Sequence, residues 1–118
     1  MANIYKNAFF DLTNTNKTTV FTCPVGSTVL VKTIQITNIS AGNVEIEGFI
    51  VDTSASSAEF EFVHDTISNK TFKNLASGTI VLEESDILKL KAGSANTLAG
   101  TIGYLEMNRS DQNGEEKR

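Results

Sequence analysis

The stretch from Gly78 to Ala92, GTIVLEESDILKLKA, limits the fold of this chain more than any other segment. Read at a period of two residues, it places five apolar side chains on one side of an extended chain: Ile80, Leu82, Leu88, Leu90 and Ala92. This alternation is typical of a half-buried antiparallel hairpin, with residues 83–86 as its loop. A helix would have to begin on β-branched residues without a suitable cap. We therefore predict a hairpin of two strands.

The longest run of β-branched residues, 27–38, alternates in the same way but changes parity halfway. Its inward candidates form two pairs of opposite parity: Val29 and Val31, then Ile34 and Ile36. One extra residue in a strand, a β-bulge, would bring both pairs to the same face, so we expect a bulge near Lys32-Thr33. A strand that is covered on both faces would also fit the pattern.

Other apolar residues mark the inner faces of further strands. They are Val44, Ile46 and Ile50 in the clearest alternation, Ile67, Phe72 and Leu75 in a weakly patterned segment, and Ile102 and Tyr104 near the end. Turn signals recur roughly every 8 to 12 residues, the spacing of a sandwich or jelly roll. We predict an all-β fold, a single antiparallel β-sandwich or jelly-roll domain of about eight strands over residues 13–107. Residues 1–12 form an N-terminal arm or first strand, and the charged residues 108–118 form a disordered tail.

Charge and composition narrow the range of partners. The net charge is −4 and the ten Lys and Arg residues are scattered, which argues against nucleic acid and anionic membranes as partners. No apolar run approaches the roughly 20 residues of a membrane span. The single cysteine, Cys23, rules out an internal disulfide and, with no signal peptide, fits synthesis in a reducing cytoplasm.

The residues that carry chemistry in enzymes are sparse in this chain. His64 is the one histidine, and Cys23 directly precedes a proline with no base near it in sequence, so neither pattern indicates a nucleophile. A zinc or cupin-type metal site needs clustered His and Cys residues that the chain does not supply. Three carboxylates in the 83–86 loop could recruit a cation, but we interpret them as a solvated turn. We predict no catalytic residue, no metal site and no cofactor, and hence a protein that is not an enzyme.

The N-terminal segment carries the best candidates for an interface. Phe9 and Phe10 are adjacent, so an extended backbone points them to opposite faces, and one core is not expected to bury both. A spare aromatic on an edge strand is a hazard to a monomer and useful to an assembly. The predicted interface residues are Ile4, Tyr5, Phe9 and Phe10. We expect a homo-oligomer or a particle-bound subunit in which Ile4 to Leu12 lies at the contact.

Several short motifs together suggest a family. They are YKNA at 5–8, TCPVGST at 22–28, VKTI at 31–34, VLEESDILKLKAG at 81–93 and GYLE at 103–106. In these motifs the chain resembles small virion structural proteins of tailed bacteriophages, including marine and cyanobacterial ones. The resemblance covers most of residues 4–107, and it departs from the family at two positions. Ser85 stands where related hairpins commonly have Gly, and Cys23 replaces a more usual aliphatic residue.

The resemblance implies a β-sandwich subunit of a phage particle with no catalytic residue to carry over. Its first implication is a capsid decoration (cement) protein that binds the particle through loops, an edge strand and the N-terminal arm. Its partners would be other virion proteins, the major capsid protein or neck and tail proteins, and analogy with decoration proteins favours a homotrimer. A neck, tail or fibre protein is the alternative within this class, and a module that binds a host glycan is the alternative outside it. The expected location is the virion, after synthesis in the cytoplasm of the host bacterium.

Overall fold

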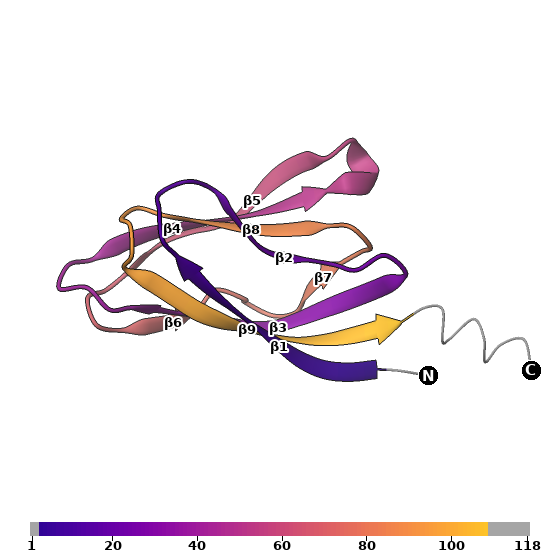
Figure 1. Ribbon diagram of the computed structural model, residues 1–118, viewed down its shortest axis with the longest axis horizontal. Helices are drawn as coiled ribbons and strands as arrows, with labels where there is room; N and C mark the ends of the chain where they lie inside the picture. The colour runs from indigo at the N-terminus through magenta and orange to yellow at the C-terminus, as the bar shows by residue number, and fades with distance from the viewer. Residues whose placement is uncertain (1–2, 109–118) are drawn as a thin grey trace, which may run out of the picture.

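Two antiparallel sheets packed face to face make up residues 3–108, the part of the chain that this computed structural model describes (Figure 1). One sheet, sheet A, has the order β1-β9-β3-β6. Both β6 and β7 pair with β3 along the edge that faces away from β9, β6 with residues 35–37 and β7 with residues 29–31. The second sheet, sheet B, has the order β2-β8-β4-β5. The predicted all-β sandwich is confirmed. The predicted tail lies outside the described residues, except for Asn108, which ends β9.

The strand bounds follow the predicted segments closely. In sheet A they are β1 Asn3–Leu12, β9 Leu98–Asn108, β3 Ser27–Asn38, β6 Phe72–Asn74 and β7 Ile80–Leu82. In sheet B they are β2 Thr18–Thr22, β8 Ile87–Ala92, β4 Val44–Asp52 and β5 Ala58–Ile67. A short 3₁₀ turn, Thr53–Ala55, joins β4 to β5. The N-terminal segment is a strand that pairs along its whole length with β9, so the alternative of a detached arm is not observed.

The predicted hairpin over 78–92 is wrong in its pairing and right in its faces. β7 pairs with β3 in sheet A, whereas β8 pairs with β2 and β4 in sheet B, so residues 83–86 cross from one sheet to the other. Leu82, Leu88, Leu90 and Ala92 are fully buried, and Ile80 packs against the core. Both sheets turn their inner faces to the same core, so the apolar side chains are buried equally well in a crossing and in a hairpin. Alternation specifies which side is buried but not which strand is the partner.

The bulge expected in β3 is confirmed. The register between β3 and β9 shifts between Val31 and Thr33, so Lys32 is the extra residue. The side chains on both sides of the shift, Val29, Val31, Ile34 and Ile36, are all fully buried. One strand thus contributes two pairs of branched side chains to one core.

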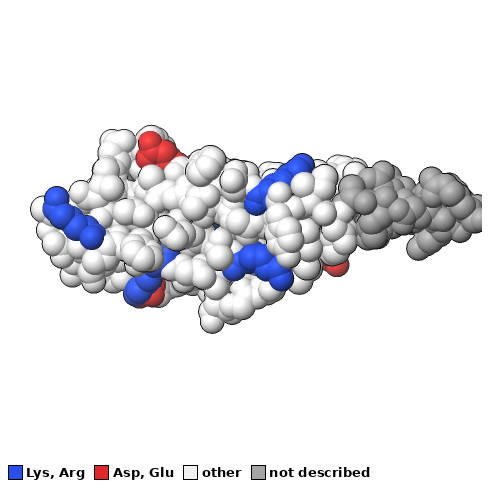
Figure 2. All heavy atoms as spheres, turned by 90° about the horizontal axis from the view of Figure 1, so that it is seen from below, with Lys and Arg blue, Asp and Glu red and all other residues white. Residues whose placement is uncertain are grey.

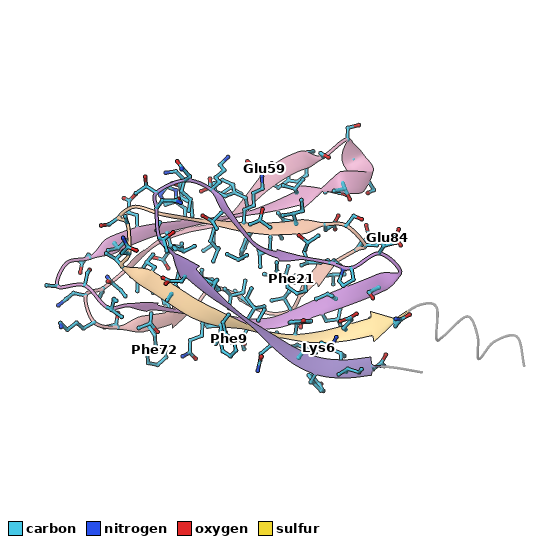
Figure 3. The ribbon with its side chains drawn as sticks, viewed as in Figure 1. Lys6, Phe9, Phe21, Glu59, Phe72 and Glu84 are labelled. Atoms are coloured by element: carbon cyan, nitrogen blue, oxygen red, sulfur yellow. The ribbon has the colours of Figure 1, made fainter. Side chains whose placement is uncertain are left out.

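The exposed position of Phe72 contradicts its prediction as a core residue. Its neighbour Lys73 pairs with Ile36, which faces the core, so Phe72 lies with its own partner Thr37 on the outer side of sheet A. The Phe72 side chain is 66% exposed and points away from the sandwich (Figure 3). The other two candidates of that segment, Ile67 and Leu75, are buried as predicted.

Gly100 in β9 provides a test of the packing between β9 and its neighbours. A Cβ atom at this position would overlap the backbone oxygen of Gln35 in β3 and lie 2.7 Å from the Phe10 ring in β1. We expect Gly100→Ala to lower the free energy of unfolding by about 3 kcal/mol and the melting temperature by roughly 12 °C. The matched control is Gly42→Ala, because nothing lies within 4 Å of a Cβ there. Equal melting temperatures for both variants would mean that β9 does not pack as closely as described.

Candidate interaction surface

The four predicted interface residues lie on β1, at one edge of sheet A, and the structure divides them. Tyr5 and Phe9 are both 75% exposed, on the outer side of the sheet, and Ile4 is 48% exposed. Phe10 points the other way and packs in the core at 9% exposure. The expectation that one core would not bury both phenylalanines is confirmed. Phe10 must leave the interface set, because its side chain is not available to a partner.

An apolar row crosses sheet A on its outer side. The strand registers place Tyr5 of β1 beside Leu105 of β9, Leu105 beside Leu30 of β3, and Leu30 beside Val81 of β7. Residues paired across antiparallel strands point to the same face. The row therefore continues over four strands, and it ends on two well-exposed side chains, Tyr5 and Val81.

Two further aromatics widen this row into a face. Phe9 lies beside Thr101, two pairs along the same outer side, and Phe72 lies beside Thr37 at the opposite edge. We call the outer side of sheet A that contains these residues the apolar face; its apolar members are Tyr5, Phe9, Leu30, Phe72, Val81 and Leu105. Figure 2 shows this side mostly white, with separate basic and acidic groups. Among residues 3–108, eight large apolar side chains are well exposed, and four of them lie on this face: Tyr5, Phe9, Phe72 and Val81.

Most residues between the apolar members are small or uncharged, and the exception is Lys32, the extra residue of the β3 bulge, which is exposed and donates to the Thr79 hydroxyl at 3.4 Å. Thr33, Gln35, Ala99, Thr101 and Gly103 occupy the outer positions of the two central strands. Asp11, beside Ala99, brings a carboxylate to one corner of the face. A patch of aromatic and aliphatic side chains with few charges among them has the composition of the centre of a protein–protein interface, where charge is depleted.

The outer side of sheet B has the opposite character. Its charged side chains form ion pairs: Glu59 with Lys17 and with Lys89 at 3.7 Å, and Glu47 with its cross-strand neighbour Lys91 at 3.5 Å. The hydrogen bond from Lys17 holds the pKa of Glu59 below its usual range. Lys17 also lies over the Phe49 ring, 4.3 Å from its centroid, and covers the large apolar side chain beneath it. The outer side of sheet B therefore presents charged groups to water, whereas the apolar face presents large apolar side chains.

His64 lies within a cluster that sequence reasoning missed. It is an exposed residue inside β5, not in a turn, and it pairs with Glu47 across β4. Its ring nitrogens lie 3.4 Å from Glu61 and 3.8 Å from Glu45. Ligand atoms of Glu47, Glu61 and His64 all lie within 4.8 Å of one another, close enough to hold a divalent cation. The ammonium group of Lys91, 3.5 Å from Glu47, opposes the binding of a cation. The sequence did not reveal this cluster because it forms only when β4 pairs with β5.

A second acidic cluster, Asp52, Glu83 and Asp86, is built into the fold. Asp86 is 6% exposed, so the prediction of a solvated turn is wrong for this residue. Its two carboxylate oxygens accept hydrogen bonds from the backbone N–H groups of Thr53 and Glu83. Asp52 accepts in the same way from Ser54 and caps the 3₁₀ turn. These carboxylates hold loops in place.

Cys23 belongs to the core. Its side chain is fully buried, and its thiol lies 3.4 Å from the carbonyl oxygen of Ser27 and 3.5 Å from that of Leu82. Its backbone carbonyl accepts a hydrogen bond from the N–H of Ser85. The residue therefore links the 23–27 turn to the loop between the sheets.

Hydrogen bonds between side chains hold the exposed half of β1 to sheet A. Lys6 donates to one oxygen of Glu106 at 3.0 Å, and the buried Ser27 hydroxyl donates to the other at 3.0 Å. The hydrogen bond from Lys6 lowers the pKa of Glu106 and raises the pKa of Lys6. Together with unbroken pairing to β9, this contact presents Tyr5 and Phe9 from a fixed strand.

Comparison with known proteins gives a fold and no family. No protein-family model and no curated protein matches the chain. It is similar to a chain in the crystal structure of the T13 IBDV viral particle, with a TM-score of 0.55 and 9% identity over 88% of this chain and 30% of that chain. A chain of the infectious bursal disease virus Gx strain gives a TM-score of 0.42 at 9% identity, over 88% of this chain and 32% of that one. The chain thus spans about a third of those it resembles and shares a β-sandwich with the first. Within residues 3–108, no helix has the length and apolar character that a membrane crossing needs.

Ser85, where the resemblance expects glycine, is a test of strain in the loop between the sheets. Its φ is 70°, in the left-handed region that disfavours residues with a Cβ. We expect Ser85→Gly to raise the free energy of unfolding by up to about 1 kcal/mol, or roughly 4 °C in melting temperature. Ser94→Gly is the control, since Ser94 lies in a turn without a positive φ and should gain nothing. A melting temperature unchanged by Ser85→Gly would remove the strain argument.

Proposed function

We propose that this protein is a virion structural protein, a decoration subunit that attaches to the capsid of a tailed bacteriophage. The observation that carries the proposal is the apolar face, which a particle surface would cover. The sequence motifs point to virion proteins of tailed phages, and the β-sandwich has a counterpart in a chain of an icosahedral virus particle. The role we propose is structural, with no reaction to catalyse and no cofactor to bind.

The contrast between the two outer faces supports attachment through one side. Sheet B turns ion pairs outward, and these remain solvated on a particle surface. Sheet A turns outward a row of apolar side chains that ends on Tyr5 and Val81, and such patches commonly mark sites of protein contact. A subunit that docks by sheet A would present sheet B to water.

The apolar face also suits a protein partner better than a sugar. Glycan sites combine aromatic platforms with polar groups that converge on the hydroxyls. On this face Tyr5, Phe9 and Phe72 are spread over opposite edges of the sheet, among Thr and Gln side chains. Aromatic side chains spread over a whole sheet in this way suit an extended contact with another virion protein.

Immunogold labelling of intact phage particles tests the location directly. We expect an antibody against this protein to label the whole capsid surface, as repeated decoration requires. Label confined to one end of the head or to the tail would contradict decoration and favour the neck, tail or fibre alternative. A glycan array run with the purified protein should give no sugar-dependent signal; a saturable signal would favour the host-glycan module instead.

A substitution on the apolar face tests the attachment surface. Val81→Lys places an ammonium group at the end of the apolar row, where docking would have to desolvate it, so we expect affinity for capsids lacking the protein to fall at least about tenfold. The measurement is co-sedimentation with such capsids. Val25→Lys is the matched control, because Val25 is 79% exposed on a turn away from the apolar face. Both variants should keep the melting temperature, and undiminished binding of Val81→Lys would exclude the apolar face.

A further inference from the structure

The edges of the two sheets differ in how they are protected against pairing with another chain. Edge strands in natural proteins are kept short, bulged or charged, because their free N–H and C=O groups are a template for a further strand. On the far side of sheet A, β6 and β7 have three residues each. In sheet B, β2 has five residues with a register shift, and β5 lies beside a register shift in β4 and carries Glu59, Glu61, His64 and Asp65.

β1 lacks two of these protections, because it is neither short nor bulged. All ten of its residues pair with β9 in one unbroken register, and it contains no proline. Every residue from Asn3 to Asn7 is exposed. In an antiparallel pair, alternate residues direct their backbone groups away from the partner strand, so β1 offers a row of donors and acceptors at its open side. Its two charged side chains, Lys6 and Asp11, cancel, so the strand does not repel a copy of itself.

We propose that two copies of this chain pair along β1, antiparallel, about a two-fold axis at Asn7. The two copies of sheet A then form one continuous sheet in which the two β1 strands lie at the centre. This inference concerns the edge of the sheet and holds whatever the apolar face docks against. It replaces the trimer suggested by analogy, because an edge that pairs with itself closes after two copies.

The register follows from the side chains that each axis position would bring together. With the axis at Asn7, Tyr5 lies opposite Phe9 of the partner subunit, and Phe9 opposite the partner's Tyr5, all on the outer side. Aromatic pairs of this kind stabilise antiparallel strands. With the axis at Lys6, two ammonium groups would oppose each other. With the axis at Ala8, Tyr5 would lie opposite the carboxylate of Asp11 of the partner subunit.

The paired arrangement also joins the two apolar faces. Tyr5 and Phe9 are the members of the apolar face nearest the open edge, and each lies at the end of a cross-strand row. Pairing at Asn7 brings these row ends beside each other, so that the aromatic side chains of both copies form one central cluster. In this register, a charged side chain introduced at Asn7 would lie opposite the same charge in the partner subunit. A basic side chain introduced at Asn3 would lie opposite Asp11 of the partner subunit.

Two matched lysine variants test the dimer and its register. In wild-type protein, sedimentation equilibrium should show a dimer. Asn7→Lys opposes two like charges at the axis and should raise the dimer dissociation constant at least about tenfold. Asn3→Lys, the same change on the same strand and the same outer side, should leave the dimer intact. Circular dichroism should be unchanged in both variants, since both positions are exposed. The melting temperature of Asn3→Lys should match the wild type, and that of Asn7→Lys should fall no further than the loss of the dimer accounts for.

Cysteine crosslinking gives an independent measurement. The one natural cysteine, Cys23, is fully buried, so an introduced thiol reacts alone. Oxidation should crosslink Asn7→Cys across the axis, whereas the two thiols of Asn3→Cys would be roughly 27 Å apart and should not react. A wild-type monomer or trimer, a dimer that survives Asn7→Lys, or equal crosslinking of both cysteine variants would overturn the proposal.

Discussion

The pairing of β3 with β9 is the contact on which the rest of the molecule depends. β3 pairs with β9 along one side and with both β6 and β7 along the other, so it organises sheet A. The extra residue at Lys32 brings two pairs of branched side chains of opposite parity into one core. Without that bulge, one pair would face water, and a strand of this length could not support both halves of the sandwich.

The sequence predicted the class of fold and the buried faces because both depend on local alternation. It predicted the bulge in β3 and the division of Phe9 from Phe10 for the same reason. It could not predict the partner of each strand, and this is why a hairpin was expected where the chain crosses between sheets. The exposure of Phe72 and the burial of Asp86 have the same origin, because each depends on which distant strand or loop lies alongside.

The residues of the apolar face could be predicted from the sequence only in part. Tyr5 and Phe9 stand out in the sequence because they lie in an aromatic N-terminal segment. Leu30, Val81 and Leu105 do not, since each comes from a different strand and becomes part of a row only through pairing. The contrast between the neutral outer side of one sheet and the ion-paired outer side of the other is likewise a property of the assembled fold. That contrast, more than any single residue, supports sheet A as the side that we propose for attachment.

The central position of β9 in sheet A has a consequence for how the chain is made. β1 and β3 both pair with β9, yet β9 is synthesised well after either of them. Residues 13–97 separate Leu12, the end of β1, from Leu98, the start of β9, and their synthesis takes a ribosome roughly 4 to 17 s. During that time β1 has no partner in its own sheet, and Tyr5 and Phe9 belong to a loose aromatic segment. Sheet A can be completed only after translation has passed residue 98, so until then the first strand is open to pairing with another chain.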